Sequence, residues 1–263
     1  MTNLLISYPD IPFRAQTMQL NYGTADSNHP ITNTVTGERG KRFALSIAWD
    51  YNANLYYDLG SSVTANIDHV IIARADLLKA LGATNIQLDS SANGSVWGNR
   101  AGTSSALQTR TYDGVRGEDL IFTQTYNNDT GTLAGSSHRY WALYFGAVTA
   151  LKSTFSKVYF GTFFDFGREP SYPAIQNRRI QRPGNRDAVY QFTLKWQGIT
   201  NTKRNELFDK ILQYRDVNPV FLYDTDDLIL NGIKLLHCRI LDASITPITA
   251  QYNDVEILFE ELI

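Results

Sequence analysis

The chain is poor in the residues that build covalent or metal-held frameworks. Among its 263 residues there is one cysteine, Cys238, which excludes an intramolecular disulfide framework and any multi-cysteine metal or iron–sulfur site. Its four histidines are scattered, without metal-ligand spacing. We therefore predict no metal and no cofactor, and we expect Cys238 to be a buried or edge thiol in a strand.

Long apolar runs and an excess of one charge are also missing. No window approaches the ~18 consecutive apolar residues of a membrane helix, and the segment Met1–Pro9 lacks the basic and apolar regions of a signal peptide. We therefore expect no membrane span and synthesis in a cytoplasm. The formal net charge of −2 does not give the basic surface of general nucleic-acid binders, so we expect no sequence-specific nucleic-acid binding.

Catalytic signatures are absent from the sequence as well. It contains no G-x-S-x-G elbow, no H-E-x-x-H and no P-loop. We expect His69 to pack in or beside a strand and His138 to lie in a solvated turn. Pairing His138 with Ser136 or Ser137 has no support in the sequence. We therefore assign no catalytic residue and predict that the protein is not an enzyme.

What the sequence does contain is a succession of short apolar runs broken by Gly, Asn, Asp, Ser and Thr, which predicts a mainly β protein. The predicted strands are Leu4–Tyr8, Thr17–Tyr22, Phe43–Trp49, Asn54–Leu59, Asp119–Gln124, Arg139–Phe145, Val189–Trp196, Val220–Tyr223, Leu228–Leu230, Lys234–Leu241 and Val255–Phe259.

One helix is expected near 202–215. Thr200 or Thr202 can cap it by accepting a hydrogen bond from a free N–H of the first turn. Four apolar residues fall on one face at helical spacing, and the Asn218-Pro219 pair prevents continuation. The four are Leu207, Phe208, Ile211 and Leu212.

The segment Asn66–Ser91 has a distinctive order: an apolar strand, an "ARADLL" turn, a Gly break and a second strand that ends in a Ser/Asn/Gly loop. It resembles the discoidin-like, galactose-binding-like β-sandwich. The resemblance implies a jelly-roll β-sandwich over residues 1–150, followed by a second β-rich domain with one packed α-helix. In such sandwiches the loops decide the ligand.

The polar loop after this segment holds two candidate contacts for a glycan or a partner. Trp97 can stack on a sugar face, and Arg100 can donate hydrogen bonds to sugar hydroxyls. Alternatively, Trp97 closes the end of the sandwich.

A group of arginines stands out in the predicted junction and linker, 151–186. One interpretation is an intersubunit contact with the acidic tail, since Arg bonds carboxylates bidentately. A second is contact with DNA phosphates in a ring lumen, and a third is a solvated loop. The arginines are Arg168, Arg178, Arg179, Arg182 and Arg186, and the tail carries Glu256, Glu260 and Glu261.

Two acidic features of the sequence could serve as calcium sites. The run Asp224–Asp227 resembles part of a Ca²⁺ loop but lacks the Gly and the distal Glu of an EF-hand, so we predict a polar turn. Asp58 and Asp89 could line a structural Ca²⁺ site at the rim of the sandwich, although nothing in the sequence selects them.

Three further segments, Val158–Pro170, Tyr190–Tyr223 and Asp254–Glu261, resemble bacteriophage tail-tip proteins of the distal tail and baseplate type. The resemblance implies a virion structural protein at the tail tip, with residues 187–263 forming a homo-oligomeric, commonly hexameric, ring that joins the tail tube to tip, hub or fibre proteins. The sequence leaves open whether the first strands belong to this second domain. The alternative function is a carbohydrate- or receptor-binding module that contacts host glycans through the jelly roll.

Overall fold

The structure is a computed structural model. It describes residues 4–9, 18–20, 27–28, 32, 43–44, 54–65, 67, 69–75, 86–94, 109–111, 118–123, 138–145, 154–155, 157–171, 178–180, 189–216, 219–224 and 235–262. The predicted strand Leu228–Leu230 lies outside this set. So do the last three residues of the predicted "ARADLL" turn. Across the described residues, no helix has the length and apolar character needed to cross a bilayer.

The chain divides into two compact units. Unit 1 comprises Met1–Tyr8 and Phe163–Ile263, and unit 2 comprises Pro9–Thr162. The first strand therefore belongs with the C-terminal part of the chain, which the sequence had left undecided. The division falls after Thr162, within a strand, and not near residue 150 where the composition changes.

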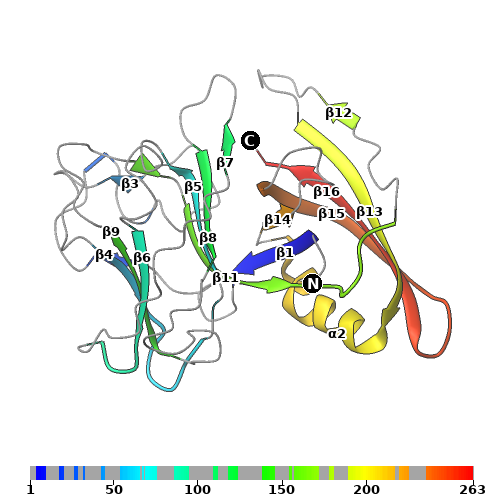
Figure 1. Ribbon diagram of the computed structural model, residues 1–263, viewed down its shortest axis with the longest axis horizontal. Coiled ribbons are helices and arrows are strands. Elements are labelled where there is room, and N and C mark those ends of the chain that lie inside the picture. The colour runs from blue at the N-terminus through cyan, green and yellow to red at the C-terminus, as the bar shows by residue number, and fades with distance from the viewer. Residues whose placement is uncertain are drawn as a thin grey trace. The chain divides into compact units, whose positions relative to one another are not determined.

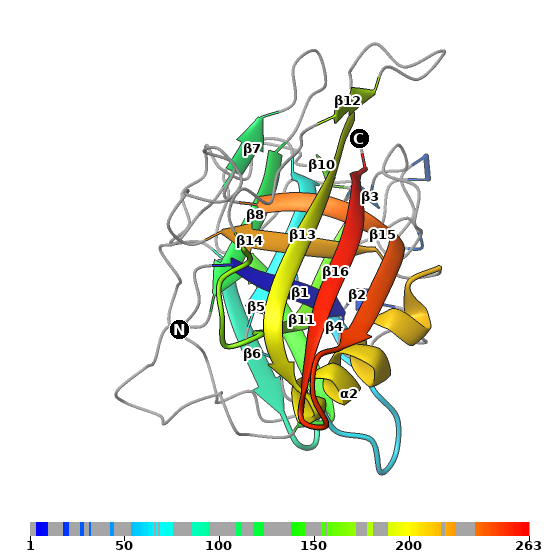
Figure 2. The ribbon, with the colours of Figure 1, turned by 90° about the vertical axis from the view of Figure 1, so that its right-hand side faces the viewer.

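Unit 1 is built on an antiparallel sheet (Figure 2). Its strands stand in the order β12, β13, β16, β15, β14, β1, and every neighbouring pair is antiparallel. The strands are β1 Leu4–Pro9, β12 Arg178–Ile180, β13 Val189–Thr200, β14 Val220–Asp224, β15 Leu235–Pro247 and β16 Tyr252–Glu261.

The β15–β16 hairpin is longer than the sequence predicted. The predicted strands ended at Leu241 and began at Val255, whereas the hairpin pairs residues as far as Pro247 and Asn253. Beyond Leu241 the polar residues alternate with Ala243 and Ile245, which pack against the core. Residues between the two predicted strands therefore form a strand that is buried on one face only.

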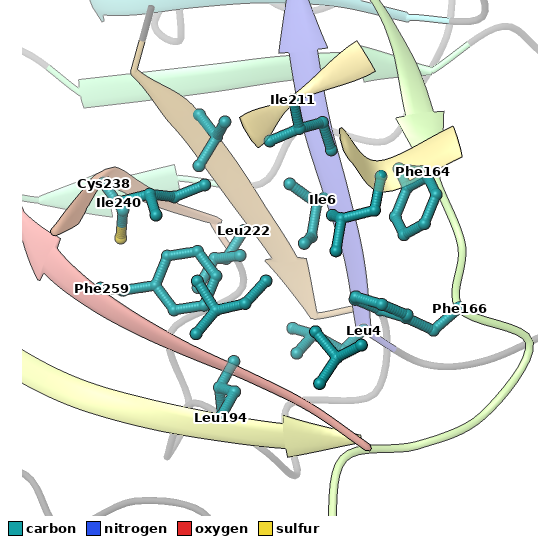
Figure 3. Close-up of a cluster of buried hydrophobic side chains, with 14 of the residues drawn as sticks. Leu4, Ile6, Phe164, Phe166, Leu194, Ile211, Leu222, Cys238, Ile240 and Phe259 are labelled. Carbon is teal, nitrogen blue, oxygen red and sulfur yellow. The ribbon is translucent and has the colours of Figure 1, made fainter. Parts of the chain in front are cut away.

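One face of this sheet carries the core of unit 1 (Figure 3). Alternate residues enter it, because successive side chains of a strand point to opposite faces. Phe166 stacks on Trp196 with ring centroids 4.1 Å apart, and Phe192 stacks on Phe259. Cys238 is buried in the same cluster, so the prediction of a buried thiol is confirmed. Full burial of one large apolar side chain of this core, such as Phe259, contributes about 1.5–3 kcal/mol to the stability of the fold.

The predicted helix is present but shorter than 202–215. Helix α2 spans Asn201–Lys210, and a 3₁₀ turn follows at Leu212–Tyr214. Thr200 caps the helix, and its side chain accepts a hydrogen bond from the backbone N–H of Lys203. The helix stops at Ile211, which has the non-helical dihedrals φ −123° and ψ −61°.

One residue of the predicted apolar face was assigned wrongly. Leu207 and Ile211 are buried in the core of unit 1, but Phe208 is 54% exposed. A helix turns by about 100° per residue, so Phe208 is rotated away from the line that Leu207 and Ile211 share. Only a narrow face of the helix packs against the core, and Phe208 lies outside that face.

In unit 2, one antiparallel sheet has the order β2-β4-β9-β6, the strands β11-β5-β8-β7 are antiparallel neighbours in another, and β10 pairs with β3. Tyr57 of β4 meets Phe160 of β11 edge to face at 5.2 Å, so the two larger sheets pack face to face. The strands are β2 Gln19–Leu20, β3 Phe43–Ala44, β4 Asn54–Asp58, β5 His69–Ala75, β6 Ile86–Ser91, β7 Thr109–Thr111, β8 Glu118–Thr123, β9 Tyr140–Phe145, β10 Thr154–Phe155 and β11 Lys157–Phe164.

The predicted fold class, mainly β with a packed helix, is confirmed by this inventory. His69 is fully buried at the start of β5, as expected of a packed histidine. Asp224 was predicted in a polar turn and is instead the last residue of β14, buried and paired in register with Leu4 of β1. The pairing with β1 extends β14 by one residue, and the other three residues of the predicted turn, 225–227, lie outside the described residues.

Candidate binding site at the loop rim of unit 2

Three strands of unit 2 place polar side chains at one edge of the four-stranded sheet. β4 ends at Asp58, β6 ends at Ser91, and β9 begins at Tyr140, which is in register with both. The loops that leave this edge are the cyan and teal segments at the bottom of unit 2 in Figure 1. We call this edge the rim site and define it by Asp58, Ser90, Asn93, His138, Arg139 and Tyr140.

An ion pair between Asp58 and Arg139 is the centre of the rim site. Arg139 donates from Nε to Oδ1 of Asp58 at 2.6 Å and from Nη2 to Oδ2 at 2.8 Å. This bidentate geometry is the strongest form of the pair. Asp58 also accepts the backbone N–H of Gly60 at 2.9 Å. The hydrogen bonds from Arg139 lower the pKa of Asp58, and the same pair raises the pKa of Arg139, so both remain charged.

The guanidinium group of Arg139 lies over the ring of Tyr140, 4.7 Å from its centroid. The loop after β6 touches that ring too, because a Cβ added to Gly94 would come within 3.1 Å of it. Gly94 also has φ +74°, a conformation that favours glycine. The approach of Gly94 therefore fixes Tyr140, and Tyr140 supports Arg139.

His138 fastens the rim site from the side of the sheet. Its Nδ1 is 2.7 Å from the hydroxyl of Ser90, its carbonyl accepts the indole N–H of Trp141 at 3.1 Å, and it forms a bridge with Ala65. Burial lowers its pKa. The expectation of a solvated turn was wrong, because Ser90, 48 residues earlier, covers one side of the ring.

The contact between Ser90 and His138 does not have the layout of a hydrolase. The serine hydroxyl is fully buried, so a substrate cannot reach it, and it meets Nδ1 of the histidine. A nucleophile needs both an adjacent base and access to the substrate. The contact therefore holds β6 to β9.

Exposed groups surround the ion pair. The turn from Gly60 to Thr64 carries exposed serines, and Ser62 has φ +68°, an uncommon conformation for a residue with a side chain. Asn93 is exposed after β6, and the Ser91 hydroxyl accepts its backbone N–H at 3.3 Å. Backbone strain of this kind occurs at ligand sites as well as in tight turns.

The geometry leaves hydrogen-bonding capacity at the surface. The Arg139 side chain is 33% exposed and that of Asp58 26%, and Nη1 of Arg139 has no hydrogen-bond partner in the described part of the chain. A donor and an acceptor therefore stand side by side with their charges balanced. Such a pair can bind two neighbouring hydroxyl groups, one that accepts from Arg139 and one that donates to Asp58.

The rim site does not fit a calcium ion. Asp58 already faces a guanidinium, and no group of three or more metal-ligating side chains occurs among the described residues. Of the two residues that could have lined a calcium site, Asp58 pairs with Arg139, and the side chain of Asp89 lies outside the described part of the chain. Asp58 and Arg139 are 81 positions apart, so no local motif pointed to their contact.

Several predicted site residues lie outside the described part of the chain: Trp97, Arg100, Arg182 and Arg186. Arg178 and Arg179 lie in β12. Arg168 is exposed, and its Nη1 donates to the carbonyl of Gln197.

The acidic tail is divided between surface and interior. Glu256 is exposed, whereas Glu260 and Glu261 are 2% exposed. Glu260 bonds Arg239 at 2.5 Å, and Glu261 accepts the backbone N–H of Tyr190. Glu256 is thus the tail carboxylate at the surface, and the subunit-interface role of this group stays a prediction.

Comparisons with known proteins give structural likenesses at low sequence identity. A scan of protein-family models and a search of curated proteins found no match. Among solved structures, the chain is similar to a CBM32 module from a family 31 glycoside hydrolase of Clostridium perfringens, at 12% identity and TM-score 0.39, over 59% of this chain and 98% of that one.

Two further similar structures are also carbohydrate-binding modules. One is a fucose-binding module from Streptococcus pneumoniae, at 13% identity and TM-score 0.38, over 59% of this chain and 95% of that one. The other is the family 32 module of C. perfringens NanJ in complex with galactose, at 8% identity and TM-score 0.37, over 59% and 98%.

Proposed function

We propose that unit 2 is a non-catalytic carbohydrate-recognition domain and that its rim site binds a neutral sugar. The observation that carries the proposal is the half-exposed Asp58–Arg139 pair, which is held in place by Gly60, Tyr140 and the loop at Gly94. Binding groups that are already positioned lose little conformational entropy when a ligand arrives.

The charge balance of the site favours a neutral ligand. The ionised carboxylate of Asp58 offsets the positive charge of Arg139, so an acidic sugar would gain little attraction and would meet the repulsion of Asp58. Neighbouring hydroxyls of a neutral sugar match the donor and the acceptor. Trp97 and Arg100 remain predicted contacts in the following loop.

A glycan array with the intact protein tests this function. We expect binding to glycans that end in a neutral sugar, and we expect Arg139→Gln to abolish it. Arg215→Gln, which removes a partly exposed guanidinium from unit 1, is the matched control and should leave array binding unchanged. The proposal is wrong if the intact protein binds no glycan, or if Arg139→Gln binds as the wild type does.

A second proposed function is self-assembly through unit 1, as expected of a distal-tail or baseplate ring at a phage tail tip. The observation that favours it is the long β15–β16 hairpin, which ends in the exposed apolar side chains Ile248 and Tyr252. Light scattering over a concentration series tests it. A closed oligomer, with sixfold mass expected, supports assembly, whereas a monomer at every concentration contradicts self-assembly of the isolated protein.

A further inference from the structure

The turn of the β15–β16 hairpin is apolar, exposed and firmly held. Residues 246–252 are all exposed and include no charged residue, yet internal hydrogen bonds fix them. The Ile248 N–H donates to the carbonyl of Tyr252 at 2.9 Å, and the Thr249 hydroxyl accepts the N–H groups of Gln251 and Tyr252, each at 3.2 Å.

The start of helix α2 supports this turn from one side, as both ribbon views show (Figures 1 and 2). Asn201 donates its backbone N–H to Gln251 at 3.1 Å and its side-chain amide to the carbonyl of Ala250 at 2.8 Å. Buried Asn253 donates to the side-chain oxygen of Asn201 at 2.9 Å. A turn with this much support presents its apolar side chains at little entropic cost on binding.

The outer edge of this hairpin is protected against pairing with a strand of another chain. Beyond Cys238, β15 pairs with no strand on its outer side in the described part of the chain. Its outward N–H at Ala243 is taken by Asp242 Oδ1 at 2.8 Å, and Pro247 has no N–H. Proline and charge on an edge strand oppose pairing with another chain. Side chains must therefore provide the contact.

The outer face of the hairpin combines apolar and acidic groups. Alternation places Tyr252 and Glu256 on the face opposite the buried Val255 and Ile257, and the bonded pair Ile248–Tyr252 lies at the end of that face. Glu256 makes no ion pair within the part of the chain that the structure describes. We call Ile248, Tyr252 and Glu256 the hairpin patch.

A matching surface lies on the other side of the same sheet. Helix α2 covers the core face with Leu207 and Ile211, so its outer side faces away from the hairpin patch. There Phe208 is 54% exposed. One turn earlier, the Arg204 guanidinium bonds the neutral side chain of Asn205 at 2.9 Å and pairs with no carboxylate among the described residues. We call Arg204 and Phe208 the helix patch.

We propose that the hairpin patch of one copy binds the helix patch of a second copy. Apolar Ile248 and Tyr252 would cover Phe208, and Glu256 would pair with Arg204. Because the two patches lie on opposite faces of one sheet, the contact is head to tail, and such contacts form rings or filaments and not two-fold dimers. This proposal rests on the proposed self-assembly of unit 1 and names its interface.

Light scattering on surface variants of the full chain tests the interface. We expect Phe208→Ser and Ile248→Ser each to raise the dissociation constant between copies about tenfold or more, as for central apolar contacts. Val63→Ser changes an exposed apolar side chain of unit 2 (39% exposed) and is the matched control. All three positions are at the surface, so the variants should fold.

A charge exchange makes the test specific to the pair. Glu256→Arg and Arg204→Glu should each weaken association, and the double variant should recover most of it. Asp209→Lys, which removes the carboxylate next to Phe208, should strengthen association. An oligomer that none of these changes weakens overturns this interface and leaves self-assembly standing. A wild-type monomer at every concentration overturns both.

Discussion

In both units a side-chain oxygen fixes an exposed loop by accepting backbone N–H groups, but the side chains that the two loops expose differ in polarity. At the rim of unit 2, Asp58 accepts the backbone N–H of Gly60 and also holds Arg139, so the loop displays charged and polar groups. At the hairpin turn of unit 1, Thr249 accepts backbone N–H groups, and the turn displays Ile248 and Tyr252. The fold thus carries two exposed loops of different chemistry, which we propose as a sugar site and a protein-contact site.

The buried tryptophans of the units differ in a similar manner. Trp141 of unit 2 donates its indole N–H to the carbonyl of His138 at 3.1 Å, so it links the core to the rim site. The indole N–H of Trp196 in unit 1 is buried and has no hydrogen-bond partner among the described residues, so we expect this side chain to contribute by packing. The core of unit 2 therefore takes part in positioning the rim site.

The largest effect should come from the packing of Trp196. We expect Trp196→Ala to lower the free energy of unfolding by about 3–5 kcal/mol, because it leaves a cavity beside Phe166. Trp196→Phe should lower the free energy of unfolding much less than Trp196→Ala does, because the indole N–H that it removes has no partner among the described residues. Trp141→Phe should cost more than Trp196→Phe and should also weaken sugar binding. Denaturant titration measures all three, and equal costs for the two Phe variants would contradict the comparison.

A smaller effect is expected at the bulge in β13. Gly198 has φ +64°, and a Cβ there would lie 2.9 Å from Nη1 of Arg168. We expect Gly198→Ala to destabilise unit 1 by about 1–3 kcal/mol. Gly167→Ala, at φ +73° with open space around it, isolates the backbone cost. If thermal unfolding shows the same loss for both variants, the contact with Arg168 contributes nothing.

The cap of helix α2 should have an effect of about 1 kcal/mol. Thr200→Ala removes the acceptor of the Lys203 N–H, while Thr200→Ser keeps a hydroxyl and should stay near the wild type. Thr202→Ala, at the other position that the sequence allowed for the cap, should be nearly neutral. A larger loss of stability for Thr202→Ala in urea titration would place the cap two residues later.

The smallest effect is a pH dependence in unit 2. Burial lowers the pKa of His138, so its unfolded form binds protons more readily, and its contribution to stability is complete above the ordinary histidine pKa of about 6.5 and declines as the pH falls below it. Asp58, whose pKa is also lowered, adds a loss only below about pH 4. Melting curves between pH 7 and pH 5 should be flatter for His138→Gln. An unchanged slope would show that His138 titrates as it does in the unfolded chain.

The sequence predicted the elements better than the contacts between them. Apolar alternation located β1, β4, β9 and β14 to within about a residue, and helical spacing with a hydroxyl cap located α2. Helical spacing failed at Phe208, because spacing alone does not show how much of the helix surface packs against the core. The sequence-based prediction also missed the lengthened hairpin, where only alternate residues are apolar.

The contacts within the rim site could not be predicted from the sequence, for a physical reason. Asp58 and Arg139 are 81 positions apart, and Ser90 and His138 are 48 apart, so only the register of β4, β6 and β9 brings them together. The sequence signal that could have pointed to the site is the position of these residues at strand ends, since loops on a rigid scaffold carry binding groups.

The central claim is that the Asp58–Arg139 pair binds a sugar. Its most direct test is NMR titration of the intact protein with galactose, fucose and N-acetylglucosamine in turn, observing the Arg139 Nε–H and the Asn93 side-chain amide. We predict saturable shifts of both signals with at least one of these sugars, and none in the Arg139→Gln protein for the Asn93 amide. Titrations that leave both signals unmoved, or that shift only residues away from the rim, would contradict the claim.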